Sequence, residues 1–286
     1  MKNTAHLKAV KTGGKLQKAT GFCCATALKM LLGAGAEAQV FSSNGLTGLT
    51  AVKQFRKKFG NWNATMCAEI TYAIKELKHP HIVRLLDLDI HAACIRMEYM
   101  DGGSLADFLL RQGALHDKQI LQVATETIAA LCCLHEHRML HRDVKPANIM
   151  LDSFSGASKL TDWIGSYAEH QSLLQGKPVG TPVFMAPEVA GMPHRHLTVS
   201  DTWSLGCTVL NMASGQLPWA NADAHGRTNE FMAMWQTSQG KAPPYDASAL
   251  NPTILAFLTV CFEPDPFRRW DAKKLRTLFE PLEMRV

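Results

Sequence analysis

One eight-residue segment constrains this chain more than any other feature: residues 141–148 read HRDVKPAN, and Asp162 follows fourteen residues later. Within the segment, Asp143 provides a carboxylate, Lys145 a cation and Asn148 an amide oxygen at fixed offsets. Transfer of a phosphoryl group needs such a set, because a carboxylate must orient the attacking hydroxyl, a cation must face the γ-phosphate and oxygen atoms must hold magnesium. The segment therefore predicts phosphoryl-transfer chemistry.

The same segment resembles the catalytic loop H-R-D-x-K-x-x-N of the eukaryotic-type serine/threonine protein kinases. The resemblance extends over residues 30–280 and implies a bilobal α+β fold, with a small β-rich N-lobe carrying one main helix and a larger, mostly helical C-lobe. The implied division is a basic N-terminal extension at 1–26, an N-lobe at 27–100 and a C-lobe at 101–286. A single kinase domain then covers about 27–282.

The resemblance also implies roles for individual residues. Asp143 is expected to accept the proton of the substrate hydroxyl, and Lys145 to neutralise the γ-phosphate of ATP. Asn148 and Asp162 are expected to hold Mg²⁺ or Mn²⁺, which as hard cations prefer oxygen ligands. A lysine two residues after the catalytic aspartate is the pattern of serine/threonine kinases.

Residues 32–41 read as a glycine turn that enters a strand, since glycines let backbone N–H groups approach phosphate oxygens. The alternation at 49–55 predicts a second strand with Ala51 and Lys53 on one face. Together they resemble the kinase glycine-rich loop and its strand lysine, although Ala38 stands where the family has a third glycine. The resemblance implies an ATP site, with Met97 at the back of the adenine pocket, that includes Leu32, Gly33, Ala34, Gly35, Val40, Ala51, Lys53, Met97, Glu98, Met100 and Met150.

The apolar spacing at 62–78 predicts a helix, capped by Asn61 or Asn63. The family's helix carries a glutamate that pairs with the strand lysine, and Glu69 is the candidate here for a catalytic pair with Lys53. Glu69 lies one residue further from the following His-Pro pair than the family pattern. Either the turn after the helix holds an extra residue or the register differs.

The segment 162–164 reads Asp-Trp-Ile where the family has Asp-Phe-Gly. A β-branched residue resists backbone angles that glycine permits, so we expect this segment to change conformation less readily than in other kinases. An alternative alignment keeps Gly165 as the motif glycine after a one-residue insertion. The loop that follows offers three candidate phosphorylation sites, whose alternative interpretation is exposed polar residues: Ser166, Tyr167 and Ser172.

Residues 180–189, GTPVFMAPEV, closely resemble the corresponding segment of the STE family, including the MAP kinase kinase kinases. In that pattern Thr181 lines the substrate pocket and Glu188 pairs with an arginine near the C-terminus, here Arg269. Asp201, in a D-x-W-S-L-G segment, is expected to hydrogen-bond to the catalytic loop. These resemblances predict that Asp201, Glu188 and Arg269 form a structural frame and are not catalytic. Earlier in the chain, the apolar spacing at 117–137 predicts a long amphipathic helix that leads to the catalytic loop.

The composition and charge of the chain limit the kinds of partner that we expect it to bind. The 286-residue chain is 47% hydrophobic with a net charge of +5, too little charge to argue for nucleic acid, and no apolar run reaches the ~18 residues that a membrane span needs. The eight cysteines, two adjacent pairs and four scattered singles, show no zinc spacing and favour reduced thiols in a cytoplasmic protein. The expected partners are proteins phosphorylated on serine or threonine and an upstream activating kinase.

Two functions stay open at this point. The first is an ATP-dependent serine/threonine protein kinase of a signalling cascade. The second is a pseudokinase that binds nucleotide or partners with little turnover, suggested by Ala38, Ile164 and the position of Glu69. A small-molecule phosphotransferase is disfavoured because it would lack the segments around Glu188 and Asp201.

Overall fold

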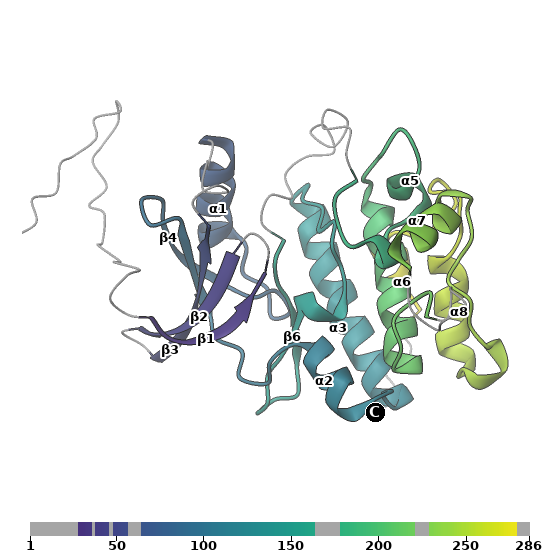
Figure 1. Ribbon diagram of the computed structural model, residues 1–286, viewed down its shortest axis with the longest axis horizontal. Coiled ribbons are helices and arrows are strands. Elements are labelled where there is room, and N and C mark those ends of the chain that lie inside the picture. Colours follow the sequence, from purple (N-terminus) through teal and green to yellow (C-terminus); the bar gives the residue numbers. More distant parts are fainter. Residues whose placement is uncertain are drawn as a thin grey trace, which may run out of the picture.

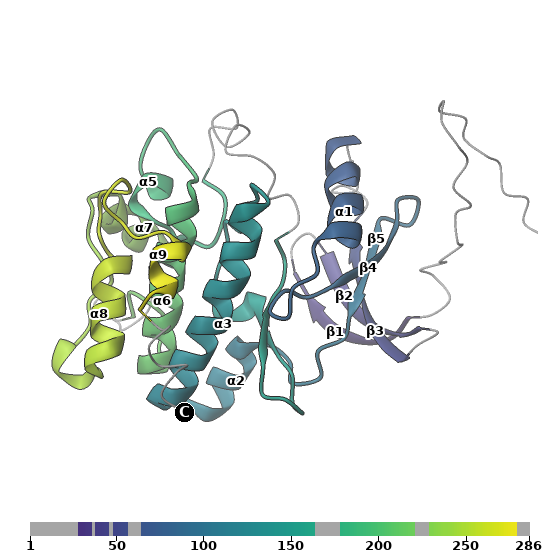
Figure 2. The same cartoon turned by 180° about the vertical axis from the view of Figure 1, so that it is seen from behind.

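The computed structural model has two lobes, one built on a β-sheet and one on helices (Figure 1). This is the predicted bilobal α+β architecture. The structure describes residues 28–35, 38–45, 48–56, 64–163, 178–220 and 229–278. Figure 2 shows the same division from behind, with α1 beside the sheet and the remaining labelled helices in the other lobe.

The N-lobe sheet is antiparallel and has the order β1-β2-β3-β5-β4. The strands span, in chain order, Leu28–Ala34 (β1), Ala38–Gly45 (β2), Gly48–Phe55 (β3), Leu85–Asp89 (β4) and Cys94–Glu98 (β5). Helix α1, Ala64–Glu76, lies between β3 and β4 in the chain and packs against β4. Ile70, Ala73 and Leu77 point into the core, as the apolar spacing predicts.

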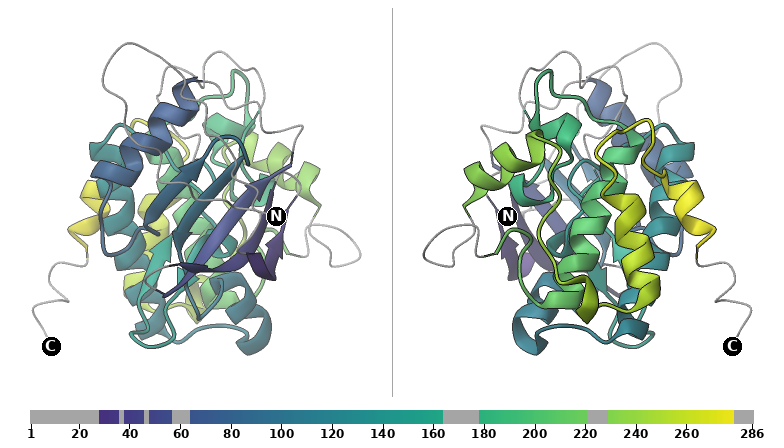
Figure 3. Two further views of the ribbon diagram at one scale, coloured as in Figure 1. Left: turned by 90° about the vertical axis from the view of Figure 1, so that its left-hand side faces the viewer. Right: turned by 90° about the vertical axis from the view of Figure 1, so that its right-hand side faces the viewer.

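The C-lobe contains the two-stranded sheet of β6 (Ile149–Leu151) and β7 (Ser158–Leu160) and most of the helices. The helices are α2 (Leu105–Gln112), α3 (Asp117–Glu136), α5 (Pro187–Ala190), α6 (Thr198–Ser214), α7 (Glu230–Ser238), α8 (Pro252–Cys261) and α9 (Ala272–Arg276). Short 3₁₀ turns lie at Pro146–Asn148, Pro182–Phe184 and Ala247–Ala249. Figure 3 shows the molecule from its two opposite ends. The five-stranded sheet is in front in the left-hand view, and the C-lobe helices α6, α7 and α8 are in front in the right-hand view.

Side-chain caps fix where several of these helices begin. The side chains of Ser104, Asn229, Asn251 and Asp271 each accept a hydrogen bond from a backbone N–H in the first turn of α2, α7, α8 and α9. Such caps satisfy backbone donors that the helix itself leaves unpaired. They are local sequence signals, and they set the boundaries of the C-lobe helices.

Helix α6 lies at the centre of the C-lobe. An unbroken run of its residues, from Ser200 to Met212, is buried, and the helix contacts α3, α8 and α9. A helix buried on every side is typical of the middle of a large core. It therefore gives the loops that pack on its first turn a rigid base.

Two predictions about the whole chain meet different outcomes. No helix of the described part is long and apolar enough to cross a membrane. Among the described cysteines, Cys67, Cys132, Cys133, Cys207 and Cys261 are free thiols, as expected. Cys94 is disulfide-bonded, so the prediction that every cysteine is reduced is wrong at that position.

Candidate active site

Three side chains of the catalytic loop and the segment after Gly180 form a closed triangle. Lys145 Nζ lies 2.6 Å from Asp143 Oδ2 and donates to Thr181 Oγ1 at 2.6 Å. Thr181 Oγ1 donates to Asp143 Oδ1 at 2.7 Å. Asn148 Nδ2 adds hydrogen bonds to the Asp143 backbone oxygen at 2.8 Å and to Oδ2 at 3.1 Å. The structure thus brings Asp143, Lys145 and Asn148 together as the motif predicts.

Asp201, in the first turn of α6, holds the backbone of this loop. Its Oδ2 accepts from the backbone N–H of His141 at 2.9 Å, and its Oδ1 accepts from the backbone N–H of Arg142 at 2.8 Å. His135 Nε2 contacts Oδ2 from the other side at 2.8 Å. Burial acts to raise the pKa of Asp201, but these hydrogen bonds and the nearby histidines outweigh it and hold the pKa below its usual value. The predicted tie between Asp201 and the loop is confirmed.

The loop passes close to Gly180, and this approach requires glycine. Gly180 has φ +113°, and a Cβ added there would lie 2.5 Å from the backbone oxygen of Arg142. Arg142 itself has φ 68°, in the left-handed region that non-glycine residues rarely adopt. The segment that carries Thr181 therefore reaches Asp143 only because residue 180 has no side chain.

The carboxylate of Asp162 reaches the site from the strand β7. Lys53 Nζ of β3 donates to Asp162 Oδ1, which joins the two lobes. Burial acts to raise the pKa of Asp162, but the charge and hydrogen bond of Lys53, helped by His141 and Lys145, bring it below its ordinary value. The carboxylate is therefore ionised at neutral pH and available to a cation.

The predicted pair between Lys53 and Glu69 is not formed. Between these two described residues there is no ion pair, and Lys53 contacts Asp162 instead. Glu69 is buried in α1, and burial raises the pKa of its carboxyl, with Arg142 acting in the opposite direction. Lys53 pairs with Asp162 of the C-lobe, and the charge that acts on the carboxyl of Glu69 is that of Arg142.

Strand register places part of the predicted nucleotide-binding set, Gly33, Val40, Ala51, Lys53 and Met97, on one face of the N-lobe sheet. Val40 lies opposite both Gly33 and Lys53, and Ala51 lies opposite Met97. Directly opposed residues point to the same side of a sheet, so Ala51 and Lys53 share a face as the alternation predicts. Leu32, Ala34 and Gly35 follow at the β1 end, and Gly35 closes the turn with a 2.8 Å hydrogen bond to the backbone oxygen of Ala38.

The other predicted nucleotide contacts lie where the lobes join. Glu98 is the last residue of β5, and Met100 is buried in the link that leads to α2. Met150 of β6 forms an isolated bridge with Ser104 in that link. The resemblance places an adenine ring between Ala51 and Met150, with Met97 behind it, and we call this predicted site the nucleotide slot.

The oxygen donors suit a divalent cation. Asp162 presents a carboxylate that is 41% exposed, and Asn148 uses its Nδ2 for Asp143, which leaves Oδ1 as its acceptor. Carboxylate and amide oxygens are the ligands that Mg²⁺ prefers. The described residues hold no cluster of three or more His, Cys, Asp or Glu side chains that suits a metal ion.

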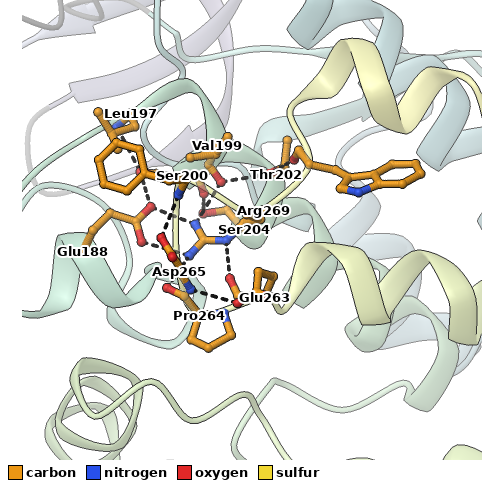
Figure 4. Close-up of polar contacts among 12 residues, drawn as sticks. Glu188, Leu197, Val199, Ser200, Thr202, Ser204, Glu263, Pro264, Asp265 and Arg269 are labelled. Carbon is orange, nitrogen blue, oxygen red and sulfur yellow. Dashed lines mark hydrogen bonds and ion pairs between the residues drawn. The ribbon is translucent and has the colours of Figure 1, made fainter.

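Behind the site, the predicted pair of Glu188 and Arg269 anchors the C-lobe (Figure 4). Arg269 Nη1 and Nη2 lie 2.7 and 3.0 Å from the two carboxylate oxygens of Glu188. Backbone oxygens of Val199, Glu263 and Pro264 accept the other donors of Arg269, and Ser200 donates to Glu188. A bidentate pair with every donor used is geometrically specific. The predicted pairing is confirmed.

Several functional contacts were not predicted from the sequence. His135 contacts Asp201, and Lys159 pairs with Glu98. The buried Nε2 of His196, which has no hydrogen-bond partner among the described residues, was also not predicted. Trp163 is buried in the core, while Ile164, Gly165 and the candidate phosphorylation sites lie outside the described residues. The cap at Asn61 or Asn63 lies outside them as well.

Comparisons with known proteins agree with this geometry. The sequence model of the protein family described as the protein kinase domain matches residues 26–278 of this chain. Serine/threonine-protein kinase SSK22 of Saccharomyces cerevisiae is 33% identical, over 90% of this chain and 21% of that protein. Mitogen-activated protein kinase kinase kinase 4 of Mus musculus is 37% identical, over 70% and 12%. Mitogen-activated protein kinase kinase kinase A of Dictyostelium discoideum is 34% identical, over 86% and 26%.

Two lobes, the loop at residues 141–148 and a lysine that reaches across to Asp162 define a protein of the kinase class. This chain belongs to the protein kinase domain family, and the relatives confirm its resemblance to the MAP kinase kinase kinases of the STE family. The chain spans between 12% and 26% of the length of these three relatives.

Proposed function

We propose that this protein transfers the γ-phosphate of ATP to serine or threonine hydroxyls of protein substrates in a signalling cascade. The triangle of Asp143, Lys145 and Thr181 carries the proposal. It holds a carboxylate and a cation side by side, with Asn148 hydrogen-bonded to the carboxylate and the charge of Lys145 acting on Asp162. A base next to a phosphate-neutralising cation is the arrangement that phosphoryl transfer uses.

Each residue of the site has a proposed role. Asp143 orients the substrate hydroxyl and accepts its proton, and Lys145 stabilises negative charge on the transferred group. Lys53 holds the phosphates of ATP, and Glu69 orients Lys53 when the two approach. Mg²⁺, when bound to Asn148 and Asp162, neutralises the charge that develops on the phosphate oxygens.

The wider context is also a proposal. We infer a cytoplasmic protein with protein substrates, an upstream activating kinase and no nucleic-acid partner. The limits of 27–100 for the N-lobe and 101–286 for the C-lobe, after an extension at 1–26, belong to the same proposal. The names of the relatives, which describe kinases of MAP kinase kinases, support protein substrates.

The decisive experiment compares the wild type with Asp143→Asn, using radiolabelled ATP, magnesium and a generic basic protein substrate. We expect phosphate transfer to fall by about 10²–10⁴-fold, because the amide cannot accept the proton. Asp117→Asn, an exposed carboxylate at the start of α3, is the matched control and keeps full activity. Removal of divalent metal with a chelator abolishes transfer in the wild type. Equal signals from the wild type and Asp143→Asn would refute the enzyme and leave nucleotide binding without turnover.

A further inference from the structure

One carboxylate connects the end of the N-lobe sheet to the C-lobe. Lys159 Nζ of β7 lies 2.8 and 3.0 Å from the two carboxylate oxygens of Glu98 at the end of β5. Glu98 Oε1 also accepts the backbone N–H of Arg84 at 2.7 Å. Glu98 therefore holds together three segments that are distant in the sequence.

The position of this pair relates it to the nucleotide slot. Glu98 directly precedes the link between the lobes and neighbours Met97 behind the slot. Lys159 lies opposite Met150, the floor of the slot, and three residues before Asp162. Each member of the ion pair is thus next to one residue of the predicted slot, Glu98 to Met97 in the chain and Lys159 to Met150 across the β6–β7 ladder.

Backbone contacts make the same seam rigid on either side of the pair. The backbone N–H of Leu160 donates to the oxygen of His81, and that of Val83 donates to the oxygen of Leu160, both at 2.9 Å. His81 Nδ1 contacts the backbone oxygen of Ser158 at 3.1 Å. These contacts hold strand β7 directly beside the segment that enters β4. The Glu98–Lys159 pair therefore lies next to a fixed contact between the lobes.

A second ion pair on β5 provides a comparison. Arg96 Nη2 lies 3.2 Å from Asp87 Oδ2, and both residues belong to the N-lobe sheet. The side chains of this pair are 22% and 28% exposed, against 22% and 26% for Lys159 and Glu98. The two pairs are similarly shielded from water, and the Glu98–Lys159 pair joins the two lobes, whereas the Arg96–Asp87 pair lies within one.

We propose that Lys159 is a positioning residue for nucleotide binding, which acts through Glu98 by fixing the adenine edge of the N-lobe against the floor provided by the C-lobe. This proposal rests on the proposed function only in requiring that the chain bind ATP or ADP. Loss of the pair widens the slot and weakens nucleotide binding, while Asp143 and its neighbours keep their geometry. The KM for ATP therefore rises, and kcat at saturating ATP stays close to that of the wild type.

The test measures binding of a fluorescent ADP analogue to the full chain, alongside thermal unfolding, for Glu98→Gln, Lys159→Met and the control Asp87→Asn. We expect Kd to rise about three- to tenfold for the first two variants and less than twofold for Asp87→Asn, which removes an equally shielded pair. Lys159→Arg, which keeps the charge, restores most of the affinity. The double exchange Glu98→Lys with Lys159→Glu recovers part of it.

Each outcome bears on a specific statement. An unchanged Kd in Lys159→Met, with phosphate transfer intact, overturns the positioning role and leaves the proposed function standing. An equal rise in Kd for Asp87→Asn also overturns it, since the effect would then follow sheet stability in general. A wild-type chain that does not bind the analogue overturns both proposals.

Discussion

The two halves of the candidate site are held in different ways. In the C-lobe, Asp143 and its loop depend on Asp201, a buried carboxylate at the start of the central helix α6. In the N-lobe, Lys53 and Glu69 belong to separate elements, and the contact of Lys53 is with Asp162 of the other lobe. The catalytic loop is thus fixed by the core of one lobe, whereas the lysine depends on how the lobes meet. Substitutions in the C-lobe frame should change stability, and those in the N-lobe should change activity.

The largest expected effect comes from the buried ion pair of the C-lobe. Arg269→Met leaves Glu188 buried without its partner, so we expect the free energy of unfolding to fall by about 3–5 kcal/mol. Both side chains are almost fully buried, and Arg269 also holds three backbone oxygens. Urea-induced unfolding measures the loss.

The neighbouring residue gives a matched control for that experiment. Arg268 makes a longer contact of 3.6 Å with Glu263, and its side chain is 75% exposed. Arg268→Met should therefore change stability by less than about 0.5 kcal/mol. Similar losses for the two arginines would show that burial of the pair is not what stabilises the C-lobe.

A side chain at Gly180 should disturb stability and activity together. Gly180→Ala places a Cβ against the backbone oxygen of Arg142 at a φ of +113°, and we expect a cost of about 2–3 kcal/mol. Gly156→Ala is the control, because Gly156 has φ +71° but open space around its Cβ position, and it should cost about 1 kcal/mol. Unfolding curves and phosphate-transfer rates are measured for both. If the two variants lose equal stability and equal activity, the close approach to Arg142 is unimportant.

The buried histidine beside the frame predicts a pH dependence. Burial and the charge of Arg142 lower the pKa of His196 from 6.5 to about 4, although Asp201 and Glu188 act in the opposite direction. The unfolded chain therefore binds more protons than the folded one between these values, and stability falls as the pH drops through this window. We expect His196 to contribute about 2 kcal/mol of loss between pH 7 and pH 5.

Chemical unfolding at several pH values measures that contribution. His196→Phe removes the titrating group, so its stability should decline less steeply with acid than that of the wild type. His91→Phe, at an exposed position, should follow the wild type. The assignment fails if the slope for His196→Phe is unchanged, whatever its absolute stability.

The same contrast explains what the sequence could predict. The ties of Asp201 and the pair of Glu188 with Arg269 follow from motifs whose partners are held by one core, and both predictions are confirmed. The helix predicted at 117–137 is observed at Asp117–Glu136, because apolar spacing specifies a buried face. The partner of Lys53 depends on how two lobes meet, and no local pattern encodes that.

Contacts between segments that lie far apart in the sequence were missed for a related reason. The pair of Glu98 and Lys159 joins residues 61 positions apart, and neither residue type is unusual where it stands. His196 reads as an ordinary loop histidine until Arg142, Ser200 and Asp201 are packed around it. Such features arise from the assembled chain, and a structure is needed to see them.

We expect the smallest change in stability from Glu69→Gln. This variant also distinguishes most clearly between the ways in which the two lobes hold their site residues. Glu69 is buried, and burial raises the pKa of its carboxyl, so an amide removes a charge that is costly to bury and leaves stability equal or slightly higher. Under the proposed role of Glu69 in orienting Lys53, phosphate transfer should nevertheless fall about tenfold, which corresponds to ~1.4 kcal/mol. Thermal unfolding and kcat are measured on the same preparations.

Glu76→Gln, at an exposed position at the end of α1, is the control and should change neither quantity. A loss of stability in Glu69→Gln would mean that its carboxylate belongs to a structural frame like that of Asp201, and the two lobes would then be built alike. Full activity with unchanged stability would mean that Lys53 works with Asp162 alone. In that case the arrangement seen here, with Lys53 on Asp162 and away from Glu69, is itself the active one.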